Sequence, residues 1–182
     1  MTTYNWSIDA AHSGIYFSIR HMVVSKVRGR FAKYAGTIHL DESDLTRSDV
    51  VVMIDAASLD TGVPDRDAHL RAPDFFDVEK FPELRFRSRR IEKVADAKYR
   101  VIGDLTIRDV TRDLTMDVEY GGKAKDPLGD ERAGFVATAS IDRKDFGLQW
   151  NQVLEAGVAI VGDRVDIELD IEAIRKAAMQ AA

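Results

Sequence analysis

The feature of this chain that most restricts its fold is an alternation of apolar and polar residues with a period of two. Val165, Ile167, Leu169 and Ile171 alternate with acidic residues. Such alternation is typical of a strand with one face in a core and one face in water. Further segments share the pattern, with the apolar positions Ile15, Phe17, Ile19, Leu84, Phe86, Tyr99, Val101, Leu105, Ile107, Leu114, Met116, Val118, Tyr120, Phe135, Ala137, Ala139 and Ile141. The sequence therefore predicts an all-β protein of about eight antiparallel strands.

Two of the predicted strands depart from simple alternation. Residues 50–54 are apolar on both parities, so we expect that strand to be covered on both faces. Between residues 28 and 40, Phe31 lies on the odd parity whereas Ile38 and Leu40 lie on the even parity. One strand needs an extra residue to switch parity, and Gly36 is the predicted site of the bulge or bend.

Helical segments are scarce in this sequence. Residues 64–71 are predicted to form a short helix, because Pro64 suits the first helical turn. Residues 73–77 are predicted as one more helical turn, and the Ala-rich residues 173–182 as a helical tail. No linker or repeat interrupts the chain, and 45% of its 182 residues are hydrophobic. We therefore expect one domain over residues 1–182 with a core of ordinary size.

Composition excludes several classes of function. The 26 Lys and Arg residues face 31 Asp and Glu residues, a net charge of -5, which argues against a nucleic-acid binder. The absence of cysteine excludes disulfides, thiolate nucleophiles and Cys-rich zinc sites. Residues 1–6 hold no signal-peptide pattern, and no apolar run reaches the ~18 residues of a transmembrane segment. A cytoplasmic location is the expectation.

About eight antiparallel strands with one apolar face form either a two-sheet sandwich or a closed barrel. The sequence favours a barrel, because closure removes exposed edges and turns every polar face outward. An eight-stranded barrel is either filled by side chains or holds one small ligand. Small inward residues indicate a cavity, and Phe17, Phe31 and Phe86 would line its wall. A packed interior in which small residues face large ones is equally compatible. The small residues are Ala133, Ala137, Ala139 and Gly103.

Titratable residues give no strong sign of catalysis or metal binding. The four histidines, His12, His21, His39 and His69, do not stand at ligand spacings, so no metal site and no cofactor are predicted. Asp9, His12 and Ser13 are too close in sequence for a nucleophilic triad. We expect Asp9 and Ser13 to bond backbone amides in a turn. The stripes of basic residues at 26–30 and 85–89 are predicted to be solvated barrel exterior.

The candidate binding residues lie on one strand and in two segments without alternation. His21 continues the inward parity of Ile19, either as a satisfied core histidine or as a contact to a ligand head. Residues 59–81 and 146–161 have the size of inserts at a barrel mouth. Phe75, Phe76 and Trp150 would either rim a ligand entrance or plug that end as ordinary core.

The order and spacing of many residues resemble the YceI-like family of lipid-binding proteins. The residues that carry the resemblance are Trp6, Ile8, Asp9, His12, Ser13, Phe17, His21, Met22, Ser25, Val27, Gly29 and Phe31, then residues 58–62, 66–70 and 74–77, Phe81, Pro82, Phe86 and Ser88, and finally residues 103–107, Val110, Thr111, Arg143, Phe146, Gly147, Gly162 and Asp163. The resemblance covers nearly the whole chain before the tail. Asp109 and Val158 depart from it, since glycine is usual there.

The resemblance implies a lipocalin-like barrel that holds a polyisoprenoid or another long-chain lipid without enzymatic chemistry. The predicted ligand-binding residues are Phe17, Ile19, His21, Phe31, Arg66, His69, Leu70, Phe75, Phe76, Phe86, Leu105, Trp150 and Leu154. One alternative is an enzyme acting on such a lipid through His21, His69 and either Asp60 or Asp67. Another is a structural or stress protein with a solid barrel. A homodimer formed through an exposed strand or the tail is also compatible with the sequence.

Overall fold

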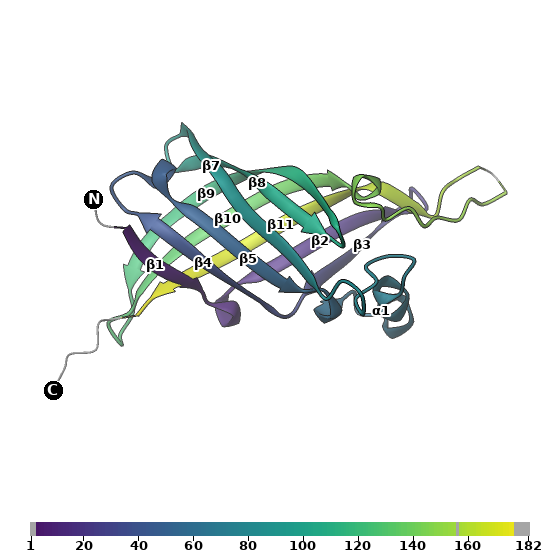
Figure 1. Ribbon diagram of the computed structural model, residues 1–182, viewed down its shortest axis with the longest axis horizontal. Helices are drawn as coiled ribbons and strands as arrows, with labels where there is room; N and C mark the ends of the chain where they lie inside the picture. The colour runs from purple at the N-terminus through teal and green to yellow at the C-terminus, as the bar shows by residue number, and fades with distance from the viewer. Residues whose placement is uncertain (1–2, 156, 177–182) are drawn as a thin grey trace.

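The protein is a closed antiparallel β-barrel with one α-helix at one end (Figure 1). The computed structural model describes residues 3–155 and 157–176. Its strands are β1 (Thr3–Ile8), β2 (Gly14–His21), β3 (Ser25–Phe31), β4 (Tyr34–Asp41), β5 (Asp49–Asp55), β6 (Leu59–Asp60), β7 (Glu83–Ala95), β8 (Lys98–Ile107), β9 (Val110–Lys125), β10 (Glu131–Asp142) and β11 (Val161–Arg175). Long strands with one apolar parity form this wall because closure gives every strand a partner on both sides.

The eleven strand segments make eight positions in the barrel wall. β1 and β2 occupy one position, interrupted by the 3-10 turn η1 (Ala10–His12), since β4 pairs with β1 and β3 pairs with β2. β3 and β4 share a second position, and β5 and β6 share a third, on either side of η3 (Ala56–Ser58). The ring closes where Ser7 of β1 pairs with Ile174 of β11. The predicted eight-stranded antiparallel barrel is confirmed.

The prediction that residues 50–54 are covered on both faces is wrong. Val50, Val52 and Ile54 face inward, whereas Val51 and Met53 are exposed on the outer face of β5. No described element packs over that outer face, because the wall of a single barrel has only water outside it. β-branched residues suit the strand on either face, so their type alone did not reveal which face is wet.

The predicted bulge at Gly36 is also wrong. β4 pairs with β5 in unbroken register, with Gly36 opposite Val52. The parity switch lies at residues 32–33, where the Lys33 amide donates to Ser58 Oγ at 3.0 Å. Gly36 serves a close approach instead, because an added Cβ would lie 2.5 Å from Ile8 Cδ1. The switch therefore falls at the corner where the neighbouring strand passes from β5 to β6.

The helical predictions have mixed outcomes. Helix α1 (Pro64–Arg71) forms as predicted, with proline in its first turn. Residues 73–77 form hydrogen-bonded turns rather than helix, and Asp77 takes a left-handed φ of 49°. Residues 173–175 continue β11 instead of forming a helix, because Ala173 pairs with Ala133 in the sheet, and residue 176 is not helical either; residues 177–182 of the predicted tail lie outside the described residues. The remaining short turns are η2 (Leu45–Arg47) and η4 (Arg143–Phe146).

No helix among the described residues has both the length and the apolar character to cross a membrane.

The two ends of the barrel differ in what covers them. The connections that run over residues 61–82 and 143–160 lie at one end, together with the β2–β3 hairpin, on the right in Figure 1. We call this the mouth end. The opposite end carries η2 and the β7–β8 and β9–β10 turns, and we call it the far end. Two separate hydrophobic clusters follow this division, a large one around the barrel interior and a small one around Trp6.

Candidate ligand-binding cavity

The barrel encloses an apolar cavity of about 570 Å³. Its wall is formed by the apolar parity of the long strands, including Phe17 of β2, Leu105 of β8 and Ile167 of β11. These are the positions that alternation assigned to the interior. The volume lies within the range of about 300–1,000 Å³ that small-molecule sites occupy. Of the two interiors that the sequence left open, the structure has the hollow one.

The cavity stays open because two aromatic rings lie along the wall rather than across the barrel. A Cβ added to Gly29 would lie 2.4 Å from Phe17 Cζ, and one added to Gly103 would lie 2.7 Å from Phe86 Cζ. Each glycine thus admits a ring tip against its backbone. Phe31 continues this lining, with its ring centroid 5.5 Å from that of Phe17.

The small inward residues play different parts from those expected. Ala137 does line the cavity. Ala133 does not, because it packs beside Trp6 in the small cluster at the far end. Gly103 leaves no void either, since Phe86 fills the space above it. The size of a residue alone could not show which of these positions border the cavity, because the space beside a small residue is either empty or filled by a large neighbour.

Helix α1 is fixed to the end of β6 by side chains that bond backbone. The buried Asp67 carboxylate accepts from the Thr61 amide at 2.9 Å and from Thr61 Oγ1 at 2.5 Å. Arg71 donates to the carbonyls of Leu59 at 2.6 Å and Ala57 at 2.8 Å. With its base held in this way, α1 directs three of the predicted residues into the cavity, namely Arg66, His69 and Leu70.

The second connection at the mouth is organised by Arg143, a buried cation at the start of η4. Its guanidinium donates to the carbonyls of Leu148 at 2.5 Å, Gly162 at 2.7 Å and Trp150 at 2.9 Å. Burial lowers the pKa of Arg143, while the Asp163 carboxylate, 3.6 Å away, opposes that shift. Arg143 therefore holds residues 148–162 in the shape that brings Trp150 over the barrel.

The two connections meet in a group of three rings, which we call the aromatic trio: His69, Phe75 and Trp150. The ring centroids are 4.7 Å apart for His69 and Trp150, 5.1 Å for His69 and Phe75, and 5.4 Å for Phe75 and Trp150. His69 Nε2 also lies 2.9 Å from the Asp74 carboxylate. All three rings line the cavity, and Phe75 and Trp150 also pack in the main core cluster, so the trio both borders the mouth and covers it.

The structure brings together all but one of the predicted ligand-binding residues. Those that line the cavity are Phe17, Ile19, His21, Phe31, Arg66, His69, Leu70, Phe75, Phe76, Phe86, Leu105 and Trp150. Leu154 does not line it, because it belongs to a hairpin beyond the wall, closed by the bridge between Val153 and Ala159. Contact of the twelve with a ligand stays a prediction.

Sequence reasoning missed several residues of the mouth. Arg20, Arg143, Leu148 and Ile160 also line the cavity. Arg143 and the Phe146-Gly147 pair are among the residues of the family resemblance, which was the available signal. Alternation could not reveal them, because they lie at or beyond strand ends.

Asp109 and Val158, the two departures from the family pattern, stand at positions that do not require glycine. The left-handed φ values belong instead to the preceding residues, Arg108 and Gly157.

The residues considered for catalysis are not assembled in the cavity. Asp67 bonds Thr61, and Asp60 accepts from the Gly62 amide at 2.8 Å; neither carboxylate lines the cavity. His21 does line it, but no hydrogen bond or ion pair joins the His21 imidazole to any described residue. Within the described part of the chain, no acid is therefore positioned to orient His21.

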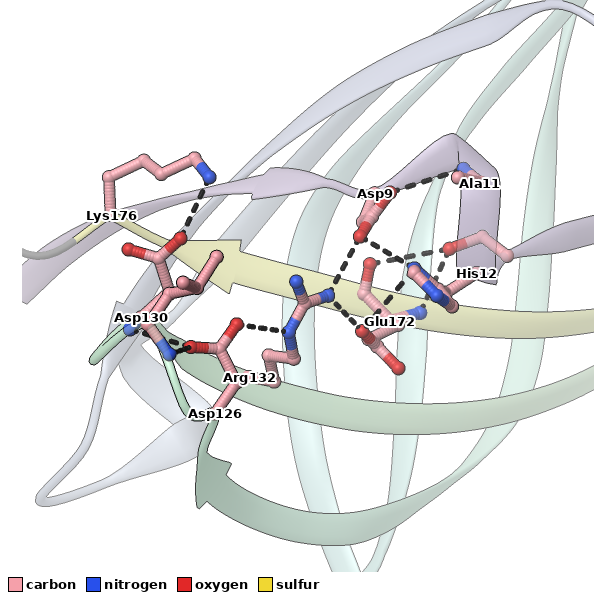
Figure 2. Close-up of polar contacts among 10 residues, drawn as sticks. Asp9, Ala11, His12, Asp126, Asp130, Arg132, Glu172 and Lys176 are labelled. Atoms are coloured by element: carbon pink, nitrogen blue, oxygen red, sulfur yellow. Dashed lines mark hydrogen bonds and ion pairs between the residues drawn. The ribbon is translucent and has the colours of Figure 1, made fainter.

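Asp9, His12 and Ser13 lie at the η1 corner, outside the cavity. Asp9 and His12 form an ion-pair cluster with Arg132 and Glu172 (Figure 2). Asp9 accepts from the Ala11 amide at 3.1 Å, and Ser13 Oγ accepts from the Glu172 amide at 2.9 Å. The predicted backbone bonds are confirmed, although that of Ser13 reaches across to β11.

The same corner places ligand atoms of Asp9, His12 and Glu172 within 4.8 Å of one another. Arg132 occupies the space between the carboxylates and donates to both, as Figure 2 shows. The imidazole of His12 and then the guanidinium of Arg132 lower the pKa of Asp9 to about 2. Two carboxylates that both accept from one arginine form an ion-pair cluster, and the guanidinium stands where a cation would otherwise bind.

Both the sequence and the structure of this chain are similar to those of known proteins. The sequence matches the YceI-like domain family over residues 6–173. A UPF0312 protein of Staphylococcus epidermidis is 37% identical over 173 residues, which cover 94% of this chain and 97% of the relative. The YCEI protein of Campylobacter jejuni, known from its crystal structure, is 32% identical in sequence. The two structures match with a TM-score of 0.74, over 87% of this chain and 91% of that one. A polyisoprenoid binding domain from Saccharophagus degradans is 15% identical and shares the fold, with a TM-score of 0.68 over 94% of this chain and 98% of that domain. With this sequence match over the length of the barrel, the chain belongs to the YceI-like family.

Proposed function

We propose that the protein binds and carries a long apolar amphiphile, a polyisoprenoid or a similar lipid, inside the barrel. The observation that carries this proposal is the cavity of about 570 Å³, lined almost throughout by aliphatic and aromatic side chains. An apolar site of this kind selects ligands by shape and apolar area, since burial of apolar surface is non-directional. The few polar side chains near the mouth, such as His21 and Arg66, would contact the ligand's head.

The energetics of such binding need no catalytic group. Each buried methylene contributes about 0.8 kcal/mol, so a tail of ~15 carbons contributes about 12 kcal/mol before the costs of ordering. The S. degradans domain of the same fold is described as polyisoprenoid binding, which supports the ligand class proposed here. Binding without chemistry also agrees with the unassembled acids and histidines described above. The cytoplasmic location and the homodimer stay predictions from the sequence.

A cavity-filling variant tests the proposal directly. Ala137 lies on the inner face of β10 and lines the cavity, whereas its neighbour Thr138 faces water. We expect Ala137→Trp to weaken binding of a hydrophobic fluorescent probe by at least about tenfold, since one indole removes much of the available volume. Thr138→Trp is the matched control and should bind the probe like the parent.

Extraction with organic solvent followed by mass spectrometry is the second measurement. We expect a long-chain lipid to be recovered from the parent protein and to be depleted in Ala137→Trp. Circular dichroism confirms that both variants keep the barrel. Unchanged probe binding in folded Ala137→Trp would contradict the proposal, as would an extract without lipid from a parent that binds no probe.

A further inference from the structure

The tip of the β2–β3 hairpin presents apolar side chains to water. Residues 22–24 connect the two strands at the mouth end of the barrel (Figure 1). Val23 is 69% exposed and Val24 is 81% exposed. Val153, on the neighbouring hairpin of residues 151–160, is 65% exposed. The Met22 amide donates to the Ile160 carbonyl at 2.9 Å, so the two hairpins are joined beside the mouth.

The backbone of this tip is unfavourable for the residues it carries. Met22 and Val23 have φ values of 51° and 65°, in the left-handed region. A β-branched residue is a genuine outlier there, whereas glycine and asparagine enter that region readily. Neither Met22 nor Val23 gains core packing in return, because both are exposed. Requirements of folding therefore do not account for valine at position 23.

The hairpin is also basic in a protein of net charge -5. Residues 10–40 contain no Asp or Glu. Arg20 lies directly opposite Lys26 across the strand pair, an arrangement that is destabilising for like charges. Lys26 is 3.7 Å from Asp166, but that carboxylate is already bonded to Arg164 at 2.8 Å. The Arg20 guanidinium makes no hydrogen bond or ion pair with any residue in the described part of the chain.

This basic and apolar tip is continuous with the opening of the cavity. Arg20 and His21, which precede the tip, line the cavity, as do Ile160 and Val161 at the end of the second hairpin. A surface that covers the tip would therefore face the mouth. A long-chain lipid is poorly soluble in water, so such a contact would shorten its path between the surface and the barrel.

We propose that the β2–β3 hairpin docks the barrel on an anionic lipid bilayer. The exposed valines would enter the boundary between headgroups and acyl chains, and Arg20 and Lys26 would lie at the level of the phosphates. Surface binding of this kind combines buried apolar area with attraction of basic residues to anionic lipid. The inference goes beyond the proposed cargo, because it states where the protein collects or delivers it.

A second copy of the chain fits this surface less well. In a twofold dimer the same patch meets itself, which would bring the Arg20–Lys26 pairs of two copies together. Like charges juxtaposed in an interface are unfavourable. No carboxylate among the described residues forms an ion pair with Arg20, and an anionic bilayer would supply that partner.

Sedimentation with phospholipid vesicles tests the proposal. We expect the full-length protein to bind phosphatidylcholine vesicles that contain about 30 mol % phosphatidylglycerol, and to bind pure phosphatidylcholine vesicles far less. Binding should weaken as salt is raised. Lys26→Gln should lower the partition coefficient by about fivefold, since one basic residue near the surface contributes about 1 kcal/mol. Val24→Asp should lower it by at least about tenfold.

Two further variants separate docking from folding. Leu128→Asp is the matched control, because Leu128 is 85% exposed in the β9–β10 turn at the far end, and its vesicle binding should equal that of the parent. Val23→Asn should raise the unfolding temperature, because asparagine suits a left-handed φ, and should weaken vesicle binding. A residue with a purely structural role would not give these opposite changes.

The outcomes distinguish this proposal from the one on cargo. Val24→Asp should bind a hydrophobic probe in vesicle-free buffer like the parent, since Val24 does not line the cavity. Equal binding of the parent to both kinds of vesicle, or unchanged binding by Val24→Asp and Lys26→Gln, would overturn the docking proposal alone. A dimer that Val24→Asp dissociates, without vesicle binding by the parent, would assign the patch to a second copy and would also overturn it.

Discussion

The far end and the mouth end of the barrel are closed by different means. At the far end, Trp6 is fully buried and packs with Ala133 and Ala173, both of which belong to the wall itself. Arg175 lies over this group, with its guanidinium 3.7 Å from the ring centroid of Tyr4. The plug is thus made of side chains that project inward from paired strands. Most of this plug cannot move without disturbing strand pairing, although Leu45 of η2 also packs against it.

The mouth end is covered by segments that lie outside the ladder of paired strands. The aromatic trio comes from the two connections, and Arg143 holds one of them through carbonyl oxygens. Moving these segments would break side-chain contacts but no pairing between long strands. The comparison teaches that one end is closed mainly by side chains of the wall itself, and the other by connections that lie outside the paired strands.

The largest expected effect is at the plug. We expect Trp6→Ala to lower the free energy of unfolding by about 3–5 kcal/mol, because it removes a fully buried indole from a site whose alanine neighbours cannot fill the space. Chemical denaturation measures this. The chain has two tryptophans, so the remaining Trp150 reports on the mouth, and its emission in the folded variant should match that of Trp6→Phe. A shifted Trp150 emission would show that the two ends are coupled.

A smaller loss is expected at the cover. Arg143→Met should cost about 2–4 kcal/mol, because several buried carbonyls lose a charged donor. In a Trp6→Phe background, Trp150 emission should move to longer wavelength and release of a bound probe should become faster. Arg112→Met, at an exposed arginine of β9, is the control and should change stability by less than about 0.5 kcal/mol. If the rate of probe release were unchanged in Arg143→Met, Arg143 would not be the residue that holds the connection over the mouth.

The smallest effect concerns the ion-pair cluster at the η1 corner. The pKa of Asp9 is lowered from 3.8 to about 2, so its carboxylate is stabilised in the folded protein. The resulting stability is fully present above about pH 4 and is lost as pH falls from there towards 2. Asp9→Asn should therefore flatten the pH dependence of the unfolding midpoint within that window. Asp96→Asn, in the exposed β7–β8 turn, should leave the dependence intact; equal slopes in both variants would contradict the assignment.

The fold and most of the cavity wall could be predicted from sequence because strand parity is local information. Phe17, Leu105 and Ile167 face inward because each keeps the apolar phase of its own strand. The mouth was harder to predict, because residues 143–160 have no period that assigns a side chain to a face. For that reason the sequence did not show that Leu154 lies off the cavity wall, and Arg143 was missed because a buried arginine and a solvated one look alike in sequence.

The sequence by itself determined that the protein is built of strands with one apolar face, favoured their closure into a barrel, and indicated which residues of the alternating strands face its interior. Only the tertiary structure decided whether that interior was filled, where the parity switch lay and what covered each end. These outcomes depend on pairs far apart in the chain, such as Ser13 with Glu172 and Gly29 with Phe17. A periodic pattern specifies which way a side chain points, but the partner it meets is set by closure of the whole sheet.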